Sequence, residues 1–180
     1  MNNFVEDWNG GYSGYYLRKF VDPNVVHEYA AAGGNQEVPW PFFRYGEVLL
    51  NYAEACLGLG QDAEAKTYID MVRKRAGLPG VTSTGQALVD DYRHERRIEL
   101  AYEDQRFFDV RRWMIPEQAY TDVQGIDILY KLNPDKVTTT PVYKVVPSVI
   151  HRAWNPSFYF LPIKLDEMNK NDQLIQNPLY

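Results

Sequence analysis

Apolar residues recur at three- and four-residue spacing over residues 42–59, a pattern that predicts an amphipathic helix. Pro41 is suited to the first turn of this helix, and Gly58 and Gly60 mark its end. The predicted inward-facing stripe consists of Tyr45, Val48, Leu49, Tyr52, Cys56 and Leu59.

A second helix is predicted over residues 63–76, where Asp62 can cap its start and Gly77 can stop it. Its inward-facing positions are small or aliphatic: Ala65, Ile69, Val72 and Ala76. Two antiparallel helices joined by a glycine turn, with alanines at close-contact positions, are typical of one tetratricopeptide unit. Because one such unit cannot bury its faces alone, we expect residues 41–77 to stack against further helices.

The spacing of apolar residues over residues 83–115 predicts a second helix pair. Ser83 or Thr84 can cap a helix that runs to about Tyr102, and a shorter helix is expected over residues 106–114. The pattern in this region is unusual because charged residues are threaded among aromatic and aliphatic ones.

Two carboxylates occupy the apolar face of this third helix. At about 100° per residue, Glu95 and Glu99 share a face with Leu88, Tyr92 and Tyr102. An unpaired buried charge costs several kcal/mol, so these groups need partners. Partners at i,i+3 spacing would be Arg96 to Glu99, Glu103 to Arg106, Arg106 to Asp109 and Asp109 to Arg112. The sequence therefore predicts a structural ion network of Glu95, Arg96, Glu99, Glu103, Arg106, Asp109 and Arg112.

The remainder of the chain lacks long helical periodicity. Residues 1–40 are loop-rich, and residues 116–180 read as loops with at most short strands and a closing segment. In the closing segment, residues 158–163 predict an extended piece, and residues 165–168 predict one helical turn. We therefore expect a single domain of 180 residues that is mainly α, with tetratricopeptide-like helical pairs, long irregular loops and a few short strands.

Aromatic residues make up 14% of the chain, which adds a candidate binding function to this picture. The C–H faces of sugars pack against aromatic rings, while polar neighbours hold the hydroxyls. Four aromatic residues in predicted loops are candidates for such stacking: Trp8, Tyr12, Trp40 and Trp154. The alternative is that these rings fix the loops onto the helices.

Charge and cysteine content exclude several classes. A net charge of −5 argues against nucleic acid as a partner. No apolar run reaches the roughly 18 residues of a membrane helix. The single Cys56 forbids an internal disulfide, leaves no cysteine metal cluster and is expected to be a buried thiol.

The sequence offers little support for an enzyme. Glu95 and Glu99 would lie about 6 Å apart, like the carboxylates of a retaining glycosidase, but arginines and aromatic rings flank them instead of an open groove. Asp91 and His94 alone do not make a metal site. The sequence also has no phosphate-binding glycine loop and no nucleophile elbow. We expect no catalytic residues, no metal and no cofactor.

Three stretches, in order along the chain, resemble the C-terminal part of the SusD/RagB family of cell-surface glycan-binding lipoproteins. They are RYGEVLLNYAEACLGLG at residues 44–60, ERRIEL followed by EDQRFFDVRRW at residues 95–113, and FYFLPIKLDEMNKNDQLIQNPLY at residues 158–180. The family more often has Pro at the position of Lys164 and Gly at that of Leu179.

The resemblance implies binding of an oligosaccharide or polysaccharide at the outer surface of the outer membrane, without bond cleavage. Its implied protein partner is a TonB-dependent SusC-type transporter, over which the binding protein lies as a lid. The family's export signal, lipid anchor and leading helices would lie upstream of Met1, so we expect membrane attachment only through that anchor. The alternative function is a helical-repeat scaffold that binds protein without sugar.

Overall fold

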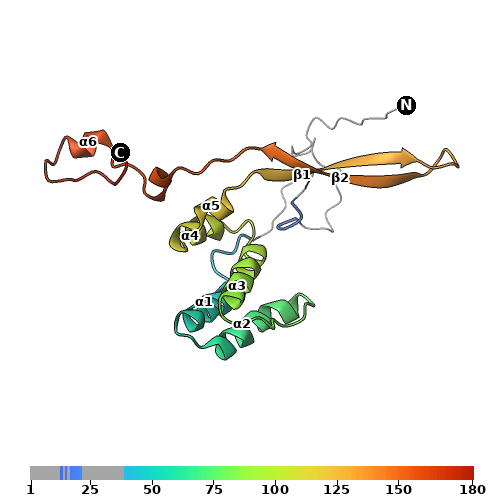
Figure 1. Ribbon diagram of the computed structural model, residues 1–180, viewed down its shortest axis with the longest axis horizontal. Helices are drawn as coiled ribbons and strands as arrows, with labels where there is room; N and C mark the ends of the chain where they lie inside the picture. Colours follow the sequence, from blue (N-terminus) through green and yellow to red (C-terminus); the bar gives the residue numbers. More distant parts are fainter. Residues whose placement is uncertain (1–12, 14, 16, 22–38) are drawn as a thin grey trace. The chain divides into compact units, whose positions relative to one another are not determined.

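The computed structural model describes residues 13, 15, 17–21 and 39–180 (Figure 1). The chain divides into two compact units, Arg18–Asp109 and Met1–Leu17 with Val110–Tyr180. The mainly α fold class is confirmed. Whether the chain behaves as a single domain stays a prediction, and the two units are described separately below.

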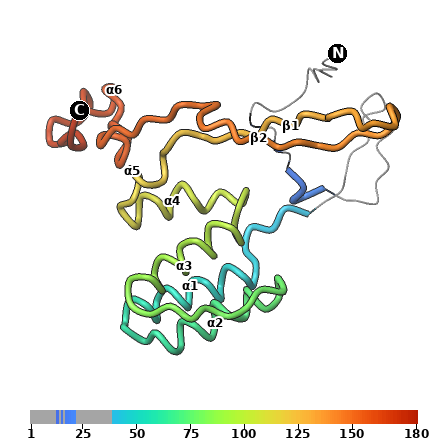
Figure 2. The backbone as a smooth tube through the Cα atoms, turned by 45° about the vertical axis from the view of Figure 1, so that its right-hand side comes forward, coloured from blue at the N-terminus to red at the C-terminus, as the bar shows by residue number. Residues whose placement is uncertain are grey.

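The first unit, Arg18–Asp109, is a small helical bundle. Helix α1 (Tyr45–Gly58) and helix α2 (Asp62–Arg75) lie side by side and are joined by a short turn, and α3 (Gln86–Glu99) packs against both (Figure 2). Helix α4 (Gln105–Arg112) begins in this unit. The predicted pair of antiparallel helices is therefore present.

The core of the bundle is aliphatic, with one buried tyrosine. Its buried residues are Leu49, Leu50, Ala53 and Cys56 from α1, Ala65, Ile69 and Val72 from α2, Leu88 and Tyr92 from α3, and Leu100 after it. Ala53 and Ala65 are fully buried, as expected where two helix backbones approach closely. The burial of Cys56 is also as predicted.

The predicted inward stripe of α1 is partly wrong. Tyr45, Val48, Tyr52 and Leu59 are exposed, whereas Leu50 and Ala53 are buried in their place. Helix α1 is apolar around most of its circumference, so its periodicity does not identify the face that packs. The small residues decide it, because only the side of Ala53 lets α2 come close. One apolar side of α1 is consequently left at the surface of the described structure.

The helix ends differ from the predicted ends by up to three residues. Helix α1 starts at Tyr45, and α2 starts at Asp62 itself, so Asp62 is not its cap. The residue that precedes α3 is Gly85, with φ of 59°, and neither predicted cap is used. Helix α3 stops at Glu99 instead of Tyr102, which therefore leaves the buried face.

In the second unit, strands β1 (Val123–Leu132) and β2 (Thr139–Ile150) form an antiparallel hairpin, drawn in Figure 1 as two long arrows. The sequence predicts only short strands here, and the observed ones have 10 and 12 residues. Two prolines hide this signal, because proline normally argues against a strand. In a two-stranded sheet every strand is an edge, and Pro141 is tolerated opposite Tyr130.

Short elements complete the second unit: α5 (Pro116–Ala119), a 3-10 helix η1 (Pro156–Tyr159) and α6 (Leu165–Met168). The predicted helical turn at residues 165–168 is confirmed, whereas η1 replaces the start of the predicted extended piece. The tail is held by Gln176, whose side chain exchanges hydrogen bonds of 2.8 and 2.9 Å with the backbone of Ile163.

The packing face of α1, with Leu50 and Ala53 buried, can be tested directly by two leucine substitutions. Leu50→Ala removes a fully buried side chain and should lower the free energy of unfolding by about 2–5 kcal/mol. Leu59→Ala makes the same change at an exposed residue directly after the helix and should cost less than about 1 kcal/mol. Urea unfolding followed by circular dichroism measures both, and equal losses would contradict this assignment of the core.

Candidate functional site

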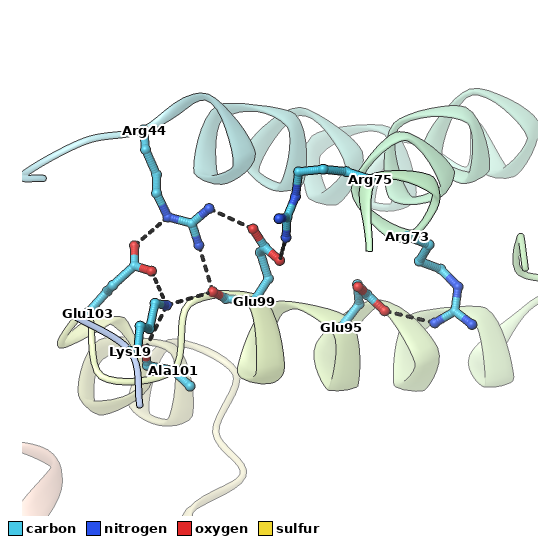
Figure 3. A network of polar contacts seen from close by, with 8 residues as sticks. All are labelled: Lys19, Arg44, Arg73, Arg75, Glu95, Glu99, Ala101 and Glu103. Atoms are coloured by element: carbon cyan, nitrogen blue, oxygen red, sulfur yellow. Dashed lines mark hydrogen bonds and ion pairs between the residues drawn. The ribbon is translucent and has the colours of Figure 1, made fainter. Parts of the chain in front are cut away.

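The C-terminal end of α3 carries a cluster of carboxylates and cations that come from distant parts of the chain (Figure 3). Arg44, directly before α1, donates from Nε to Glu103 Oε2 at 2.7 Å and from Nη1 to Glu99 Oε1 at 2.6 Å. Lys19 makes a second ion pair with Glu103, and Arg75 at the end of α2 donates to Glu99 Oε2 at 2.7 Å. We call Lys19, Arg44, Arg75, Glu99 and Glu103 the corner network.

The corner network also caps α3. Lys19 Nζ donates to the carbonyl oxygens of Glu99 at 3.0 Å and Ala101 at 2.9 Å, and Arg44 Nη2 donates to Glu99 O at 2.6 Å. The last carbonyls of a helix lack intrahelical donors and carry partial negative charge, so cations placed there are favourable. Two cations thus satisfy both the side chains and the backbone at this corner.

Gly46 makes room for this arrangement. A Cβ atom at this position would lie 2.7 Å from Arg44 Nη1 and 3.1 Å from Glu99 Oε1. The first distance is too short for the Arg44 guanidinium to stay where it is. The glycine in the first turn of α1 therefore permits the contact between Arg44 and Glu99.

Two further ion pairs extend along the buried face of α3. Arg73 Nη1 donates to Glu95 Oε2 at 2.8 Å. Arg96 Nε donates to Asp109 Oδ2 at 2.7 Å, and its Nη1 donates to Asn51 Oδ1 at 2.7 Å. Arg96 and Asp109 are 4% and 3% exposed, so both charges are removed from water and depend on each other.

The structure places five of the seven predicted network residues in ion pairs, with partners that the sequence does not predict. Glu99 and Glu103 pair with residues 19, 44 and 75, so the predicted pairs Arg96 to Glu99 and Glu103 to Arg106 are wrong. The pairs of Asp109 with Arg106 and Arg112 stay predictions. The guanidinium of Arg112 lies 5.3 Å from the ring centroid of Trp113. Sequence spacing reveals only local neighbours, and the actual partners become neighbours through the packing of α2 and the residues before α1.

The electrostatics of the corner follow from this geometry. Burial alone would raise the pKa of Glu103, but the hydrogen bonds and positive charge of Arg44 and Lys19 outweigh burial and lower that pKa below its usual value. The side chains of Glu95 and Glu99 are 7% and 8% exposed, and each is engaged by arginine. This arrangement suits a structural role and offers no open carboxylate pair for glycoside cleavage.

The predicted stacking aromatics lie in different environments. Trp40 is 49% exposed, and its ring centroid lies 4.7 Å from that of Phe20, so it presents open aromatic surface. Trp154 is half-buried in the second unit, where it stacks on Tyr120 at 5.0 Å and the Arg111 guanidinium lies 5.3 Å from its ring centroid. Trp8 and Tyr12 lie outside the described residues.

The surroundings of Trp154 leave little open ring surface. Phe158 and Tyr159 contact it edge to face, with centroids at 5.8 and 5.1 Å. Its buried Nε1 has no hydrogen-bond partner within the described residues. This tryptophan resembles the core of a small aromatic cluster more than a stacking platform.

A Ser, His and Asp meet near the base of the hairpin, but in the wrong order for nucleophilic catalysis. Ser148 Oγ donates to Asp122 Oδ2 at 2.7 Å, and His151 Nδ1 lies 2.6 Å from Asp122 Oδ1. A catalytic triad needs the histidine between serine and acid. Here the aspartate is central, and the hydrogen bond from Ser148 is the main cause that lowers the pKa of Asp122. The trio joins the residues before β1 to the end of β2.

The described residues lack both a metal site and a membrane-spanning helix. Among the described residues, no three His, Cys, Asp or Glu side chains gather as a metal site would require. In those residues, too, no helix combines the length and apolar character needed to cross a bilayer.

The first unit is thus a helical bundle with a tetratricopeptide-like pair, internally paired charges and exposed aromatic rings. The comparison with protein families makes this specific, because the model of the SusD family matches residues 4–180. The chain belongs to the SusD family.

One solved structure and one curated relative are named as SusD-like, and a second solved structure shares the fold. A SusD-like protein from Bacteroides fragilis superposes with a TM-score of 0.79 at 35% identity, over 97% of this chain and 32% of that one. A second solved structure gives a TM-score of 0.69 at 32% identity, over 94% of this chain and 28% of the other. SusD-like protein P2 of Formosa agariphila is 33% identical over 52% of this chain and 21% of its own length.

The chain thus spans about a third or less of the length of these relatives. Members of the SusD family bind glycans in nutrient uptake at the outer membrane and are not enzymes. The resemblance read from residues 44–60, 95–113 and 158–180 is confirmed.

The corner network predicts a stability effect. Glu103→Gln removes a charge that holds Lys19 and Arg44. It should lower the free energy of unfolding by about 2 kcal/mol, because Lys19 loses its carboxylate partner and Arg44 keeps only Glu99. Glu64→Gln, at an exposed residue of the same unit, is the matched control and should cost less than about 1 kcal/mol. Denaturant titration measures the unfolding free energies of the wild type and the two variants. Equal losses in Glu103→Gln and Glu64→Gln would exclude a structural role for Glu103.

The same residue predicts a pH dependence. The lowered pKa of Glu103 means that its contribution to stability is complete above its unfolded pKa of about 4.3 and is lost as the pH falls through the folded pKa. The difference in unfolding free energy between the wild type and Glu103→Gln should therefore be constant from pH 7 to 5 and shrink at lower pH. A difference that stays constant to pH 3 would contradict the lowered pKa.

Proposed function

We propose that this chain contributes to the capture of an oligosaccharide or polysaccharide at the outer surface of the outer membrane, and to its transfer to a TonB-dependent SusC-type transporter. The observation that carries this proposal is the match of the SusD family model over residues 4–180. Glycan handling by the family without bond cleavage agrees with carboxylates that are engaged by arginines.

Open aromatic rings in the first unit give the proposal a physical basis. Trp40 keeps about half of its surface exposed, and Phe42 and Phe43 follow it with 83% exposed. Sugar rings present flat C–H faces that pack on such surfaces, while their hydroxyls need polar partners at the edge. Of the two predicted stacking residues that the structure describes, Trp40 is better placed than Trp154, because Phe20 contacts its ring and still leaves about half of the residue exposed.

A second function is favoured by a different observation. The exposed side of α1 carries Tyr45, Val48 and Tyr52 at three- and four-residue spacing, and the exposed Leu59 follows directly after the helix, so this side is an apolar stripe. Such a stripe suits contact with another helix, as in stacked tetratricopeptide units. A protein-binding scaffold without sugar affinity would use this stripe and would not need Trp40.

Isothermal titration calorimetry of the chain against neutral oligosaccharides separates the two functions. We expect saturable binding that is weakened about tenfold by Trp40→Ala, because a central aromatic contact is lost. Tyr130→Ala, which removes an exposed ring from the hairpin, is the control and should bind like the wild type. Flat titrations from a chain that circular dichroism shows to be folded would favour the scaffold.

A further inference from the structure

A hollow of about 540 Å³ lies at the corner between α3 and α4. Its size falls within the range of small-ligand sites. It is lined by Leu100, Tyr102, Asp104, Arg106, Phe107 and Phe108. None of these residues belongs to the four aromatic candidates that the sequence suggests.

Aromatic rings form much of the lining. Phe107 and Phe108 are 50% and 64% exposed, and their rings meet edge to face with centroids 5.3 Å apart and planes at 81°. The two rings therefore present faces in nearly perpendicular directions. Tyr102 is 64% exposed and contributes a third ring. Large apolar side chains kept at a surface in this way mark an interaction site.

The turn that carries two of the lining residues is strained. Tyr102 and Asp104 have φ of 63° and 61°, a left-handed conformation that is unfavourable for most residues with a side chain, for Tyr102 more than for Asp104. Such strain persists only where the surroundings impose it, and it concentrates at functional sites.

The corner network supplies that restraint. Glu103 lies between the two strained residues, and its carboxylate is held by Lys19 and by Arg44 Nε at 2.7 Å. Lys19 also donates to the carbonyl of Ala101, just before the turn. The network therefore fixes the backbone that carries the side chains of Tyr102 and Asp104, as supporting residues do around a binding site.

We propose that this hollow is a binding subsite for one neutral sugar ring of the glycan, a proposal that rests on the function proposed above. The aromatic faces suit sugar C–H groups. A sugar hydroxyl both donates and accepts hydrogen bonds, and the lining offers a carboxylate acceptor in Asp104 and a guanidinium donor in Arg106. The two charges cancel, which favours a neutral sugar over an acidic one.

The experiment is a calorimetric titration of wild type and variants with the neutral oligosaccharide that binds best in the panel above. Phe108→Ala should weaken binding about tenfold, and Phe108→Tyr should retain it, because the ring is kept. Asp104→Asn should weaken binding severalfold without disturbing the turn, since asparagine tolerates the left-handed conformation. Tyr130→Ala again serves as the control outside the hollow.

The outcomes separate the two proposals. If the wild type binds and both Phe108→Ala and Asp104→Asn bind equally well, the subsite is refuted and the glycan function stands. If the folded wild type binds no sugar, both proposals fail together. If the wild type self-associates on size-exclusion chromatography and Phe108→Ala abolishes this association with sugar binding intact, the corner contacts protein and the subsite is refuted. Should Phe108→Ala not fold, the affinities of Asp104→Asn and Phe108→Tyr decide. The subsite predicts weaker binding for Asp104→Asn and retained binding for Phe108→Tyr, and equal affinities refute it.

Discussion

The pairing of buried carboxylates on α3 with cations from elsewhere in the chain is the constraint on which the first unit depends. Glu95 and Glu99 lie on α3 where an apolar helix would carry leucines, and Glu103 lies in the turn that follows. All three side chains are largely buried, and each needs a positive partner. The partners come from the residues before α1 and from the last turn of α2. The same contacts that neutralise charge therefore also fix how three helices pack.

This constraint explains which features could be predicted from the sequence. The helices could be located because apolar spacing and glycine stops are local signals, and the inward position of Glu95 follows from its place beside Leu88 and Tyr92. The partners could not be predicted, since Arg73 and Arg44 reach α3 only through tertiary packing. The packing face of α1 was also beyond reach, because a helix that is apolar on two sides gives no preferred direction and only the close contact at Ala53 selects one.

The candidate site shows the same division between local and long-range information. Of the aromatic residues in predicted loops, Trp40 is open, whereas Trp154 is enclosed by Tyr120 and its neighbours. The aromatic residues at the α3–α4 corner were overlooked because they stand in a charged helical stretch that reads as structural. Only the early end of α3 at Glu99 turns Tyr102 and Asp104 outward. An ion network and a ligand surface can thus share one short segment of sequence.

The placement of Lys19 and Arg44 also bears on how the chain folds. Each of these two residues contacts Glu99 across a long stretch of sequence, 80 residues for Lys19 and 55 for Arg44. Helices α1 to α3 share an aliphatic core that does not include these contacts, whereas the left-handed turn at Tyr102 and Asp104 is held by them together with the backbone hydrogen bond from Glu103 N to Leu100 O. Contacts of such long range carry the largest loop-closure entropy and form late. The corner should therefore be the last part of the bundle to become ordered and the first to open, so that amide protons around residues 101–104 exchange ahead of those in the core.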